Sequence, residues 1–269
     1  MLAIQPGDHV GAPFTLPSQF ATTTVTVAER ALSHQAQMMI FPGDPHRDGL
    51  DGFQRGLGRR SPAIAAALTT GQVRVGDSRR VHLAPGRFDR EHLEEAYTAA
   101  TRRALADGYS GLWVSIDMSW ARDVAPDALV SFEESASELF TTGQLTAVCH
   151  YDTQIFPAGQ VTAACAAHPA GLEHEAPLRH RRSPDGRTLR LSGEADLSNA
   201  AAFAALTRTL RPGDVLDITE MTFLDVRALA TIVRAYRDTA GLSVRAGRTH
   251  AGLLDLVGIG RRASSATTS

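Results

Sequence analysis

Apolar runs alternate with amphipathic segments along the first two thirds of the chain. Apolar residues at spacings of three and four predict helices, whereas short continuous apolar runs next to glycine or proline predict buried strands. Strands that are apolar on both faces are typical of a parallel sheet covered by helices. The expected helices cover about 28–34, 62–68, 90–106 and 127–142, and the expected strands cover about 38–41, 72–77, 112–116 and 145–153. Residues 49–60 are glycine-rich, and we expect an irregular connection there.

A break in this rhythm indicates a second unit. Residues 167–187 have no apolar period and contain three prolines, which is typical of a linker or domain entry, and we place it near residues 170–178. The pattern then predicts a hairpin through the turn "SPDG", followed by alternating strands and helices. We therefore predict an N-terminal domain over 1–172, a C-terminal domain over 176–260 and a disordered tail over 261–269.

Composition excludes several functions. The 269 residues include 27 basic and 29 acidic side chains without a basic run, which argues against direct binding of nucleic acid. The chain contains no lysine, so Schiff-base chemistry and the phosphate-binding lysine of a P-loop are excluded. No apolar run approaches the ~20 residues that span a bilayer, and the N-terminus does not resemble a signal peptide. We expect a soluble cytoplasmic protein without membrane contact, and the arginine-rich composition suggests a bacterial source.

Motifs for catalysis, metals or cofactors are not recognised. The ten histidines lack the HExxH spacing of a zinc site, and neither a GxSxG elbow nor a dinucleotide fingerprint is present. Cys149 and Cys165 lack CxxC spacing, so we expect buried free thiols. Glu133 and Glu134 lie on one expected helix, where we expect a solvated surface. We therefore predict no catalytic residue, no metal and no cofactor, and we expect that the protein is not an enzyme.

Three phrases in the second unit follow a family pattern. They are "LSGEADLSNAAAF", "DITEMTFLDVRALATIV" and "HAGLLDLVGI". With them, residues 176–260 resemble a STAS domain, the fold of bacterial anti-sigma factor antagonists and of the cytoplasmic part of sulfate transporters. The resemblance implies a mixed sheet with helices. It also implies docking to an anti-sigma factor or kinase-like regulator, or to other STAS proteins.

The turn in "FLDVRALATIV" corresponds to the family's phosphorylation switch. In the family, "FLD" precedes two small residues and a glycine at a helix start, and the second small residue is the serine or threonine that a partner kinase phosphorylates. A helix N-terminus suits this role because its free amides favour phosphate. Here Asp225 matches the family aspartate, while Val226 and Arg227 occupy the two small positions and Ala228 replaces the glycine. Arg227 cannot accept phosphate, so this sequence excludes control by phosphorylation at that position.

Further candidates for partner binding lie beside this turn. Asp196 matches the other family acid, and Ser198 follows it. Thr222 is either an alternative phosphate acceptor or an ordinary strand-end residue that bonds the local backbone. Asp225 is also a candidate N-cap of the following helix. The predicted partner-binding set is Asp196, Ser198, Thr222, Asp225, Val226 and Arg227.

The first unit has a family pattern of its own. It includes the phrases "PGDHVGAPF", "GRFD", "GYSGLWVSIDMSWA", "TAVCHYDTQIFP" and "AAHP". With them, residues 5–170 resemble the MEDS domain, a sensory module named for methanogen and methylotroph proteins and for a dichloromethane-responsive repressor. The resemblance implies a RecA- or KaiC-like sheet without a phosphate loop, and no GxxxxGK[ST] motif is present. The sequence departs from the family at Gly11, where a cysteine is common.

Polar and aromatic residues follow two of the expected strands of this unit. The carboxyl ends of parallel strands lie at one edge of a sheet, where α/β folds bind ligands. These residues either line a shared pocket for a small molecule or cap the core and the following turns. Two histidines are expected near the same edge. The ligand-binding candidates are Asp117, Trp120, Tyr151, Asp152, His9 and His168.

Taken together, the two resemblances predict a regulatory protein similar to anti-sigma factor antagonists. Its sensory domain would control a partner-binding STAS domain that lacks the usual phospho-acceptor serine, through a shift between two domain arrangements. Two alternatives stay open. One is a degenerate RecA-like protein that binds a nucleotide, and the other is a scaffold that assembles with other STAS proteins.

Overall fold

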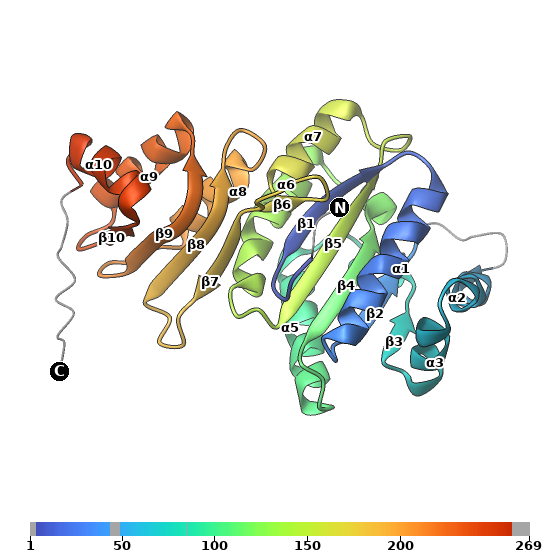
Figure 1. The fold of residues 1–269 in the computed structure, drawn as a ribbon. Coiled ribbons are helices and arrows are strands. Elements are labelled where there is room, and N and C mark those ends of the chain that lie inside the picture. The colour runs from blue at the N-terminus through green and yellow to red at the C-terminus, as the bar shows by residue number, and fades with distance from the viewer. Residues whose placement is uncertain (1–3, 44–48, 85, 260–269) are drawn as a thin grey trace.

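The protein folds around two separate β-sheets (Figure 1). The computed structural model describes residues 4–43, 49–84 and 86–259. A six-stranded sheet lies in the N-terminal part, and a four-stranded sheet lies in the C-terminal part. These sheets confirm the predicted α/β class. The predicted disordered tail lies outside the described residues, and the predicted domain bounds stay a prediction.

The N-terminal sheet is parallel throughout, with the strand order β3-β2-β4-β5-β1-β6. The central strands β4 and β5 are buried along almost their whole length, as expected of a sheet that is covered on both faces. The strands are β1 (His9–Phe14), β2 (Gln37–Phe41), β3 (Val73–Val75), β4 (Leu112–Asp117), β5 (Leu145–Asp152) and β6 (Ala170–Gly171).

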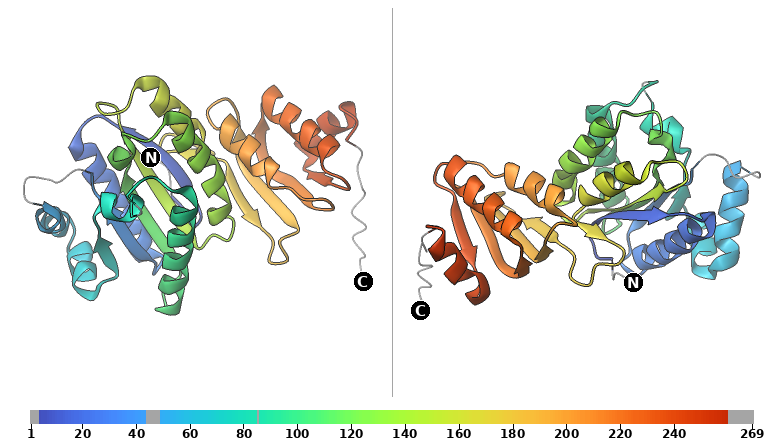
Figure 2. Two further views of the ribbon diagram at one scale, coloured as in Figure 1. Left: turned by 180° about the vertical axis from the view of Figure 1, so that it is seen from behind. Right: turned by 90° about the horizontal axis from the view of Figure 1, so that it is seen from above.

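Helices cover both faces of this sheet (Figure 2). On one face, the core is built with side chains of α1 (Pro17–Ser33), α2 (Gly49–Arg60) and α3 (Pro62–Thr70). On the other face, the core is built with side chains of α5 (Arg90–Ala106), α6 (Pro126–Ala136), the 3₁₀ turn η2 (Ser137–Phe140) and α7 (Ala158–Ala166). Two short elements, α4 (Ser78–His82) and the 3₁₀ turn η1 (Met118–Ala121), follow strands β3 and β4.

The expectation of an irregular segment over residues 49–60 is wrong, because these residues form helix α2. Phe53 and Leu57 lie four residues apart, and both are buried against the core. Burial of this apolar pair outweighs the low helix propensity of the glycines around it. Strands β1 and β6 were also not expected from the sequence.

The C-terminal sheet is mixed, with the order β10-β9-β8-β7. Strand β7 (Arg179–Arg182) pairs antiparallel with β8 (Thr188–Ala195) through the predicted hairpin, while β8, β9 (Val215–Leu224) and β10 (Ser243–Ala246) are parallel. Buried residues of three helices join one core, which includes Phe203, Leu216 and Ile232. These helices are α8 (Ala200–Arg208), α9 (Val226–Asp238) and α10 (Arg248–Leu256).

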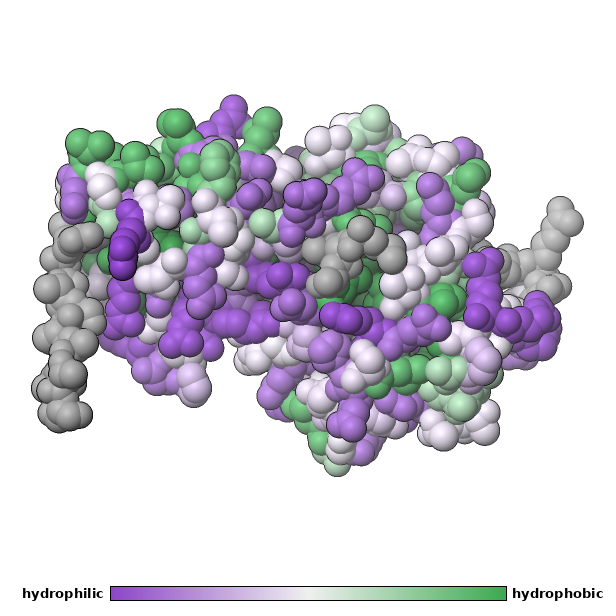
Figure 3. Space-filling model, in the orientation of Figure 1, coloured by the Kyte–Doolittle hydropathy of each residue, from purple (hydrophilic) through white to green (hydrophobic). Residues whose placement is uncertain are grey.

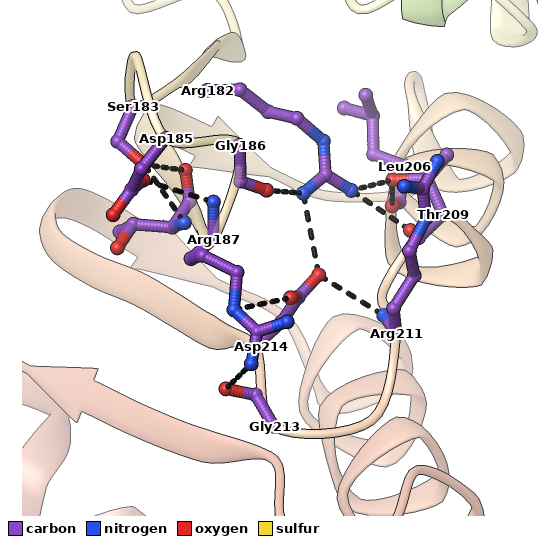
Figure 4. A network of polar contacts seen from close by, with 11 residues as sticks. Arg182, Ser183, Asp185, Gly186, Arg187, Leu206, Thr209, Arg211, Gly213 and Asp214 are labelled. Carbon is purple, nitrogen blue, oxygen red and sulfur yellow. Dashed lines mark hydrogen bonds and ion pairs between the residues drawn. The ribbon is translucent and has the colours of Figure 1, made fainter.

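Asp214 lies in the loop between α8 and β9, and its side chain bonds this loop to the β7–β8 hairpin (Figure 4). Its side chain is almost fully buried, and Oδ2 accepts hydrogen bonds from the Arg211 amide at 3.1 Å and from Arg182 Nη1 at 3.3 Å. Arg187 Nε lies 3.9 Å from Oδ1. This carboxylate therefore joins the β7–β8 hairpin to the loop between α8 and β9.

Asp214→Ala is expected to lower the free energy of unfolding by about 2 kcal/mol, because the Arg211 amide and the Arg182 guanidinium both lose their charged acceptor. Urea unfolding measures the change. Asp238→Ala is the matched control: this aspartate is exposed at the end of α9, and its removal is expected to change the free energy of unfolding by about 0.5 kcal/mol or less. Equal effects of the two substitutions would contradict the role of Asp214.

Candidate functional site

A buried carboxylate, Glu133, lies at the centre of a polar cluster inside the N-terminal domain. It is only 1% exposed, although it belongs to helix α6. The Tyr151 hydroxyl donates a hydrogen bond to Oε1 at 2.7 Å. Oε2 lies 3.3 Å from His9 Nε2 and 3.4 Å from His168 Nε2. The expectation of a solvated Glu133 is therefore wrong, because α6 turns this residue towards the sheet.

Cys149 completes this group of side chains. Its Sγ lies 3.7 Å from His9 Nε2, and donor atoms of His9, Glu133, Cys149 and His168 all lie within 4.8 Å of one another. Cys149 and Tyr151 are two residues apart on β5, so their side chains point to the same face of the sheet. We call these five residues the Glu133 cluster. Both cysteines are free, and Cys149 is buried as expected, but Cys165 is only half-buried.

Burial and neighbouring charges set the protonation of the cluster. Burial, with a smaller contribution from His168, lowers the pKa of His9 to about 4, so this imidazole is neutral at pH 7. Burial alone would raise the pKa of Glu133, but His168 and His9 outweigh it and hold this pKa below its ordinary value. The cluster therefore contains a buried, ionised carboxylate that two imidazoles face.

Gly11 makes room for one of these imidazoles. A Cβ atom at this position would lie 3.1 Å from Cys165 Cα and 3.1 Å from His168 Nδ1. Such separations are tighter than ordinary van der Waals contact. The departure from the family's common cysteine therefore coincides with the place where His168 packs against β1.

The ligand-binding candidates divide into two groups. His9, Tyr151 and His168 meet in the Glu133 cluster. Asp117 and Asp152 lie elsewhere, and each accepts a hydrogen bond from the amide two residues later, at 2.9 Å and 2.8 Å. Both aspartates therefore hold turns at the strand ends. Burial, as the largest cause, raises the pKa of Asp117.

A cavity of about 300 Å³ opens at the carboxyl edge of the sheet, near the sixth candidate, Trp120. Strand β2 connects to β3 on one side, whereas its neighbour β4 connects to β5 on the other, so the crevice between β2 and β4 is a topological switch point. Trp120 is buried and stacks on His82, with ring centroids 4.7 Å apart. The lining also includes Pro42, Gly43, Leu50, Asp77, Ser78, Arg79, Ser119 and Arg122.

Two turns lie side by side at the carboxyl edge of the C-terminal sheet. In the parallel pair of β8 and β9, Ala195 pairs with Leu224, and the Asp225 amide donates a hydrogen bond to the Ala195 carbonyl at 3.0 Å. Asp225 Oδ1 accepts a hydrogen bond from the Ala228 amide at 2.7 Å, so Asp225 is the N-cap of α9. The turn after β8 therefore lies next to the start of α9.

The other partner-binding candidates lie around these turns. Asp196 Oδ1 accepts hydrogen bonds from the Ser198 amide at 2.8 Å and from the Ser198 hydroxyl at 2.6 Å. The hydrogen bond from the hydroxyl is the largest cause of a lowered Asp196 pKa. The exposed Thr222 donates a hydrogen bond to the Gly193 carbonyl at 3.0 Å, which ties β9 to β8.

Exposed apolar side chains accompany this edge. Val226 is 83% exposed, Leu197 is 64% exposed and Phe223 is 48% exposed, and Arg227 is also exposed. Figure 3 shows apolar side chains along the upper edge of the C-terminal part. The sequence motifs did not single out Leu197 or Phe223, although both lie within the quoted phrases. We call residues 196–198, 223 and 225–227 the docking rim.

Strand β7 joins the C-terminal part to the N-terminal domain. Arg179 forms a two-pronged ion pair with Asp8, from Nε to Oδ1 at 2.9 Å and from Nη2 to Oδ2 at 3.1 Å. The buried His180 donates from Nε2 to the Ser137 carbonyl at 2.9 Å. Helix α6 contributes a further pair, with Glu134 Oε2 2.5 Å from Arg208 Nη2 of α8. These contacts form the domain interface.

A protein-family model described as "MEDS: MEthanogen/methylotroph, DcmR Sensory domain" matches residues 8–169, which is more than half of the chain. The match contains all five residues of the Glu133 cluster. A search of curated proteins finds no match. The matched segment ends before β6, and the STAS resemblance of the C-terminal part stays a prediction. Among the residues that the structure describes, no helix is both long and apolar enough to cross a bilayer.

Proposed function

The chain belongs to the MEDS family of sensory domains, and on this premise we propose that it is a signalling regulator whose sensory domain controls a partner-docking unit of the STAS type. Family membership indicates the sensory or regulatory role. The proposed partner of the C-terminal unit is an anti-sigma factor or a related kinase-like regulator. In this proposal the chain is not an enzyme, and a signal in the N-terminal domain favours one arrangement of the two units.

The docking rim is the observation on which this proposal rests. Strands β8 and β9 end side by side, so their turns present Leu197, Val226 and Arg227 on one edge of a rigid sheet. Exposed apolar side chains that gather in one place mark sites of protein contact, and a few such residues usually dominate binding energy. Arg227 adds a fixed positive charge where the family's switch would add a phosphate. This chemistry suits a partner surface with an apolar patch and an acidic border.

The domain interface supports control by the sensory domain. Asp8 binds Arg179, while its neighbour His9 belongs to the Glu133 cluster. Glu134 pairs with Arg208, while its neighbour Glu133 is the centre of the cluster. The same two segments of backbone therefore contact both the cluster and the C-terminal unit. A change in the cluster that moves β1 or α6 also changes the contacts of β7 and α8.

Capture of proteins from a bacterial lysate, with the full-length chain as bait, tests the docking proposal. We expect a retained protein that mass spectrometry identifies as an anti-sigma factor of the kinase type. Val226→Asp is expected to weaken its binding at least about tenfold, because a charge replaces an apolar anchor. Ile155→Asp is the matched control, since Ile155 is 38% exposed but belongs to the N-terminal domain. Equal affinity of wild type and Val226→Asp for the captured protein would contradict the proposal, as would the absence of any such protein.

Arg227→Ser provides a second arm of this test with the same captured kinase. Serine at this position restores the hydroxyl at the start of α9, where Asp225 still caps the helix. We expect phosphorylation of Arg227→Ser and none of the wild type at this position, measured by mass spectrometry. A kinase that binds the wild type but leaves Arg227→Ser unmodified would contradict the assignment of the turn to the STAS switch.

A nucleotide-binding protein is the second candidate function, and the cavity at the switch point favours it. Arg79 and Arg122 line this cavity of about 300 Å³, and guanidinium groups bind phosphate well. Thermal stability measured with ATP and with GTP tests this candidate. Stabilisation that Arg79→Ala abolishes would support nucleotide binding. Hydrolysis of ATP above a buffer control would contradict a purely regulatory role.

A further inference from the structure

We propose that the Glu133 cluster is a binding site for one zinc ion, with His9 Nε2, Glu133 Oε2, Cys149 Sγ and His168 Nε2 as the four ligands. The four residues come from β1, α6, β5 and the segment after α7. The proposal goes beyond the docking function and does not depend on it, since all four ligands lie in the N-terminal domain.

The separations between the donor atoms match a tetrahedral site. Zinc binds nitrogen and oxygen at about 2.0–2.2 Å and sulfur at about 2.3 Å, so the edges of the tetrahedron measure about 3.3–3.6 Å. The observed edges are 3.3 Å from His9 Nε2 to Glu133 Oε2, 3.4 Å from His168 Nε2 to the same oxygen, and 3.7 Å from His9 Nε2 to Cys149 Sγ. No pair of donors exceeds 4.8 Å. Shifts of about 1 Å or less would therefore place all four around one ion.

The hydrogen bonds of His168 leave one of its lone pairs facing the carboxylate. Its Nδ1 lies 2.8 Å from the Ala164 carbonyl, which can only accept, so Nδ1 has the proton. In the neutral imidazole, Nε2 then presents a lone pair to Glu133 Oε2. Nε2 is buried, lies 3.4 Å from Glu133 Oε2 and has no hydrogen bond of good geometry, so a positive charge between the two atoms, either a proton or a metal ion, is needed to stabilise this contact. The contact of Nδ1 with a backbone carbonyl favours the metal ion, because such a carbonyl is a frequent partner of the second nitrogen of a metal-binding histidine.

Other features of the cluster suit zinc. The Tyr151 hydroxyl donates a hydrogen bond to Glu133 Oε1, so Oε2 is left to bind the zinc ion as a single oxygen ligand. His9, Glu133 and Cys149 border a small cavity of about 30 Å³, which provides space beside the donors. Two imidazoles, a thiolate and a carboxylate favour zinc over magnesium or calcium, which prefer sets of oxygen ligands. On binding, the Cys149 thiol releases its proton to solvent, so the carboxylate and the thiolate together neutralise the ion.

Cobalt(II) serves as the spectroscopic probe for this site. The full-length chain is unfolded, reduced and refolded without oxygen in the presence of equimolar Co²⁺, and the same procedure with Zn²⁺ is followed by dialysis and metal analysis. We expect about one Zn²⁺ per chain. With Co²⁺ we expect the visible bands of a tetrahedral site together with a thiolate-to-cobalt charge-transfer band. A wild-type chain that folds and retains neither ion overturns the proposal.

The two cysteines offer a matched pair of variants. Cys149→Ser is expected to remove the charge-transfer band, whereas Cys165→Ser is expected to keep it, because Cys165 lies outside the set of four donors. Circular dichroism checks that each variant folds. Persistence of the band in folded Cys149→Ser, or its loss in folded Cys165→Ser, would overturn the ligand assignment. If Cys149→Ser does not fold, His168→Gln replaces it, and the cobalt spectrum must then change from that of the wild type.

Discussion

Glu133→Ala is expected to lower the free energy of unfolding by about 3 to 5 kcal/mol at neutral pH, because a buried hydrogen-bond acceptor and the volume of a buried side chain are both lost. Without this carboxylate, the buried His9 and His168 imidazoles face no negative charge, and the Tyr151 hydroxyl loses its acceptor. The missing side chain also leaves a cavity. Urea unfolding in the presence of a chelator, followed by the fluorescence of the buried Trp113 and Trp120, measures the loss without a contribution from metal.

The next residue along α6 provides the control. Glu134 is partly exposed and pairs with Arg208, whose side chain is mostly exposed, so Glu134→Ala is expected to cost about 1 kcal/mol or less. Both variants remove a glutamate from the same helix and alter its propensity equally. If Glu133→Ala destabilised the protein no more than Glu134→Ala, the cluster would not be a buried charged centre.

Acidification from pH 6.5 to about pH 4 is expected to cost about 6 kcal/mol through His82 and His180, which lie outside the Glu133 cluster, and the buried His150, whose pKa burial lowers to about 3, adds to the loss in the same direction. Burial is the largest cause that lowers the pKa of both His82 and His180 to about 4 from an ordinary value of 6.5. Between these two pH values, the unfolded chain binds a proton at each site and the folded chain does not. The free energy of unfolding therefore rises with pH through this window. Above pH 6.5 both histidines are neutral in the folded and the unfolded chain, so stability is not reduced there, and the loss grows as the pH falls towards 4. Each histidine contributes about 3 kcal/mol.

Neutral imidazoles suit the hydrogen bonds at both sites. His180 Nε2 donates to the Ser137 carbonyl, and His82 Nδ1 lies 2.7 Å from the Ser78 carbonyl, while its Nε2 accepts from the Tyr97 hydroxyl at 2.6 Å. A charged His82 would donate from Nε2 to the Tyr97 oxygen, so the hydroxyl proton would have to turn away from the ring.

Urea unfolding at a series of pH values measures the expected acid effect. His180→Gln should reduce the slope of the free energy against pH by about 1.4 kcal/mol per unit within the window. An unchanged slope would show that His180 titrates alike in the folded and unfolded chains.

The strands with continuous apolar runs were predicted from the sequence, but β1 was not. The buried Asp8 lies just before strand β1, the buried His9 is its first residue, and Gly11 lies within it. Its polar and small residues serve the cluster and the interface rather than a hydrophobic pattern. Helix α2 was not predicted for a related reason. Its glycines indicated an irregular segment, although Phe53 and Leu57 are spaced as a buried helical pair. Local propensity therefore failed where tertiary contacts decide the structure.

The candidate site was predicted only in part. His9, Tyr151 and His168 were selected as residues near the sheet edge, but Glu133 and Cys149 were not recognised as their partners. Metal motifs rely on short spacing, whereas these donors come together from distant parts of the chain. One signal was present: Leu129, Phe132, Glu133 and Ala136 follow the spacing of a buried helical face, so a glutamate occupied an apolar stripe.

Amide hydrogen exchange tests most directly whether the sensory domain controls the docking rim, with full-length wild type compared with full-length Glu133→Gln. Glutamine keeps the volume of the side chain, removes its charge and replaces one acceptor oxygen by an NH2 donor. We predict altered protection in the cluster, in β7 (Arg179–Arg182) and at the start of α9 beside Asp225, because Asp8 and Glu134 link the cluster to the C-terminal unit. Altered protection that is confined to residues 8–169, with β7 and the docking rim unchanged, would contradict control of the C-terminal unit by the sensory domain.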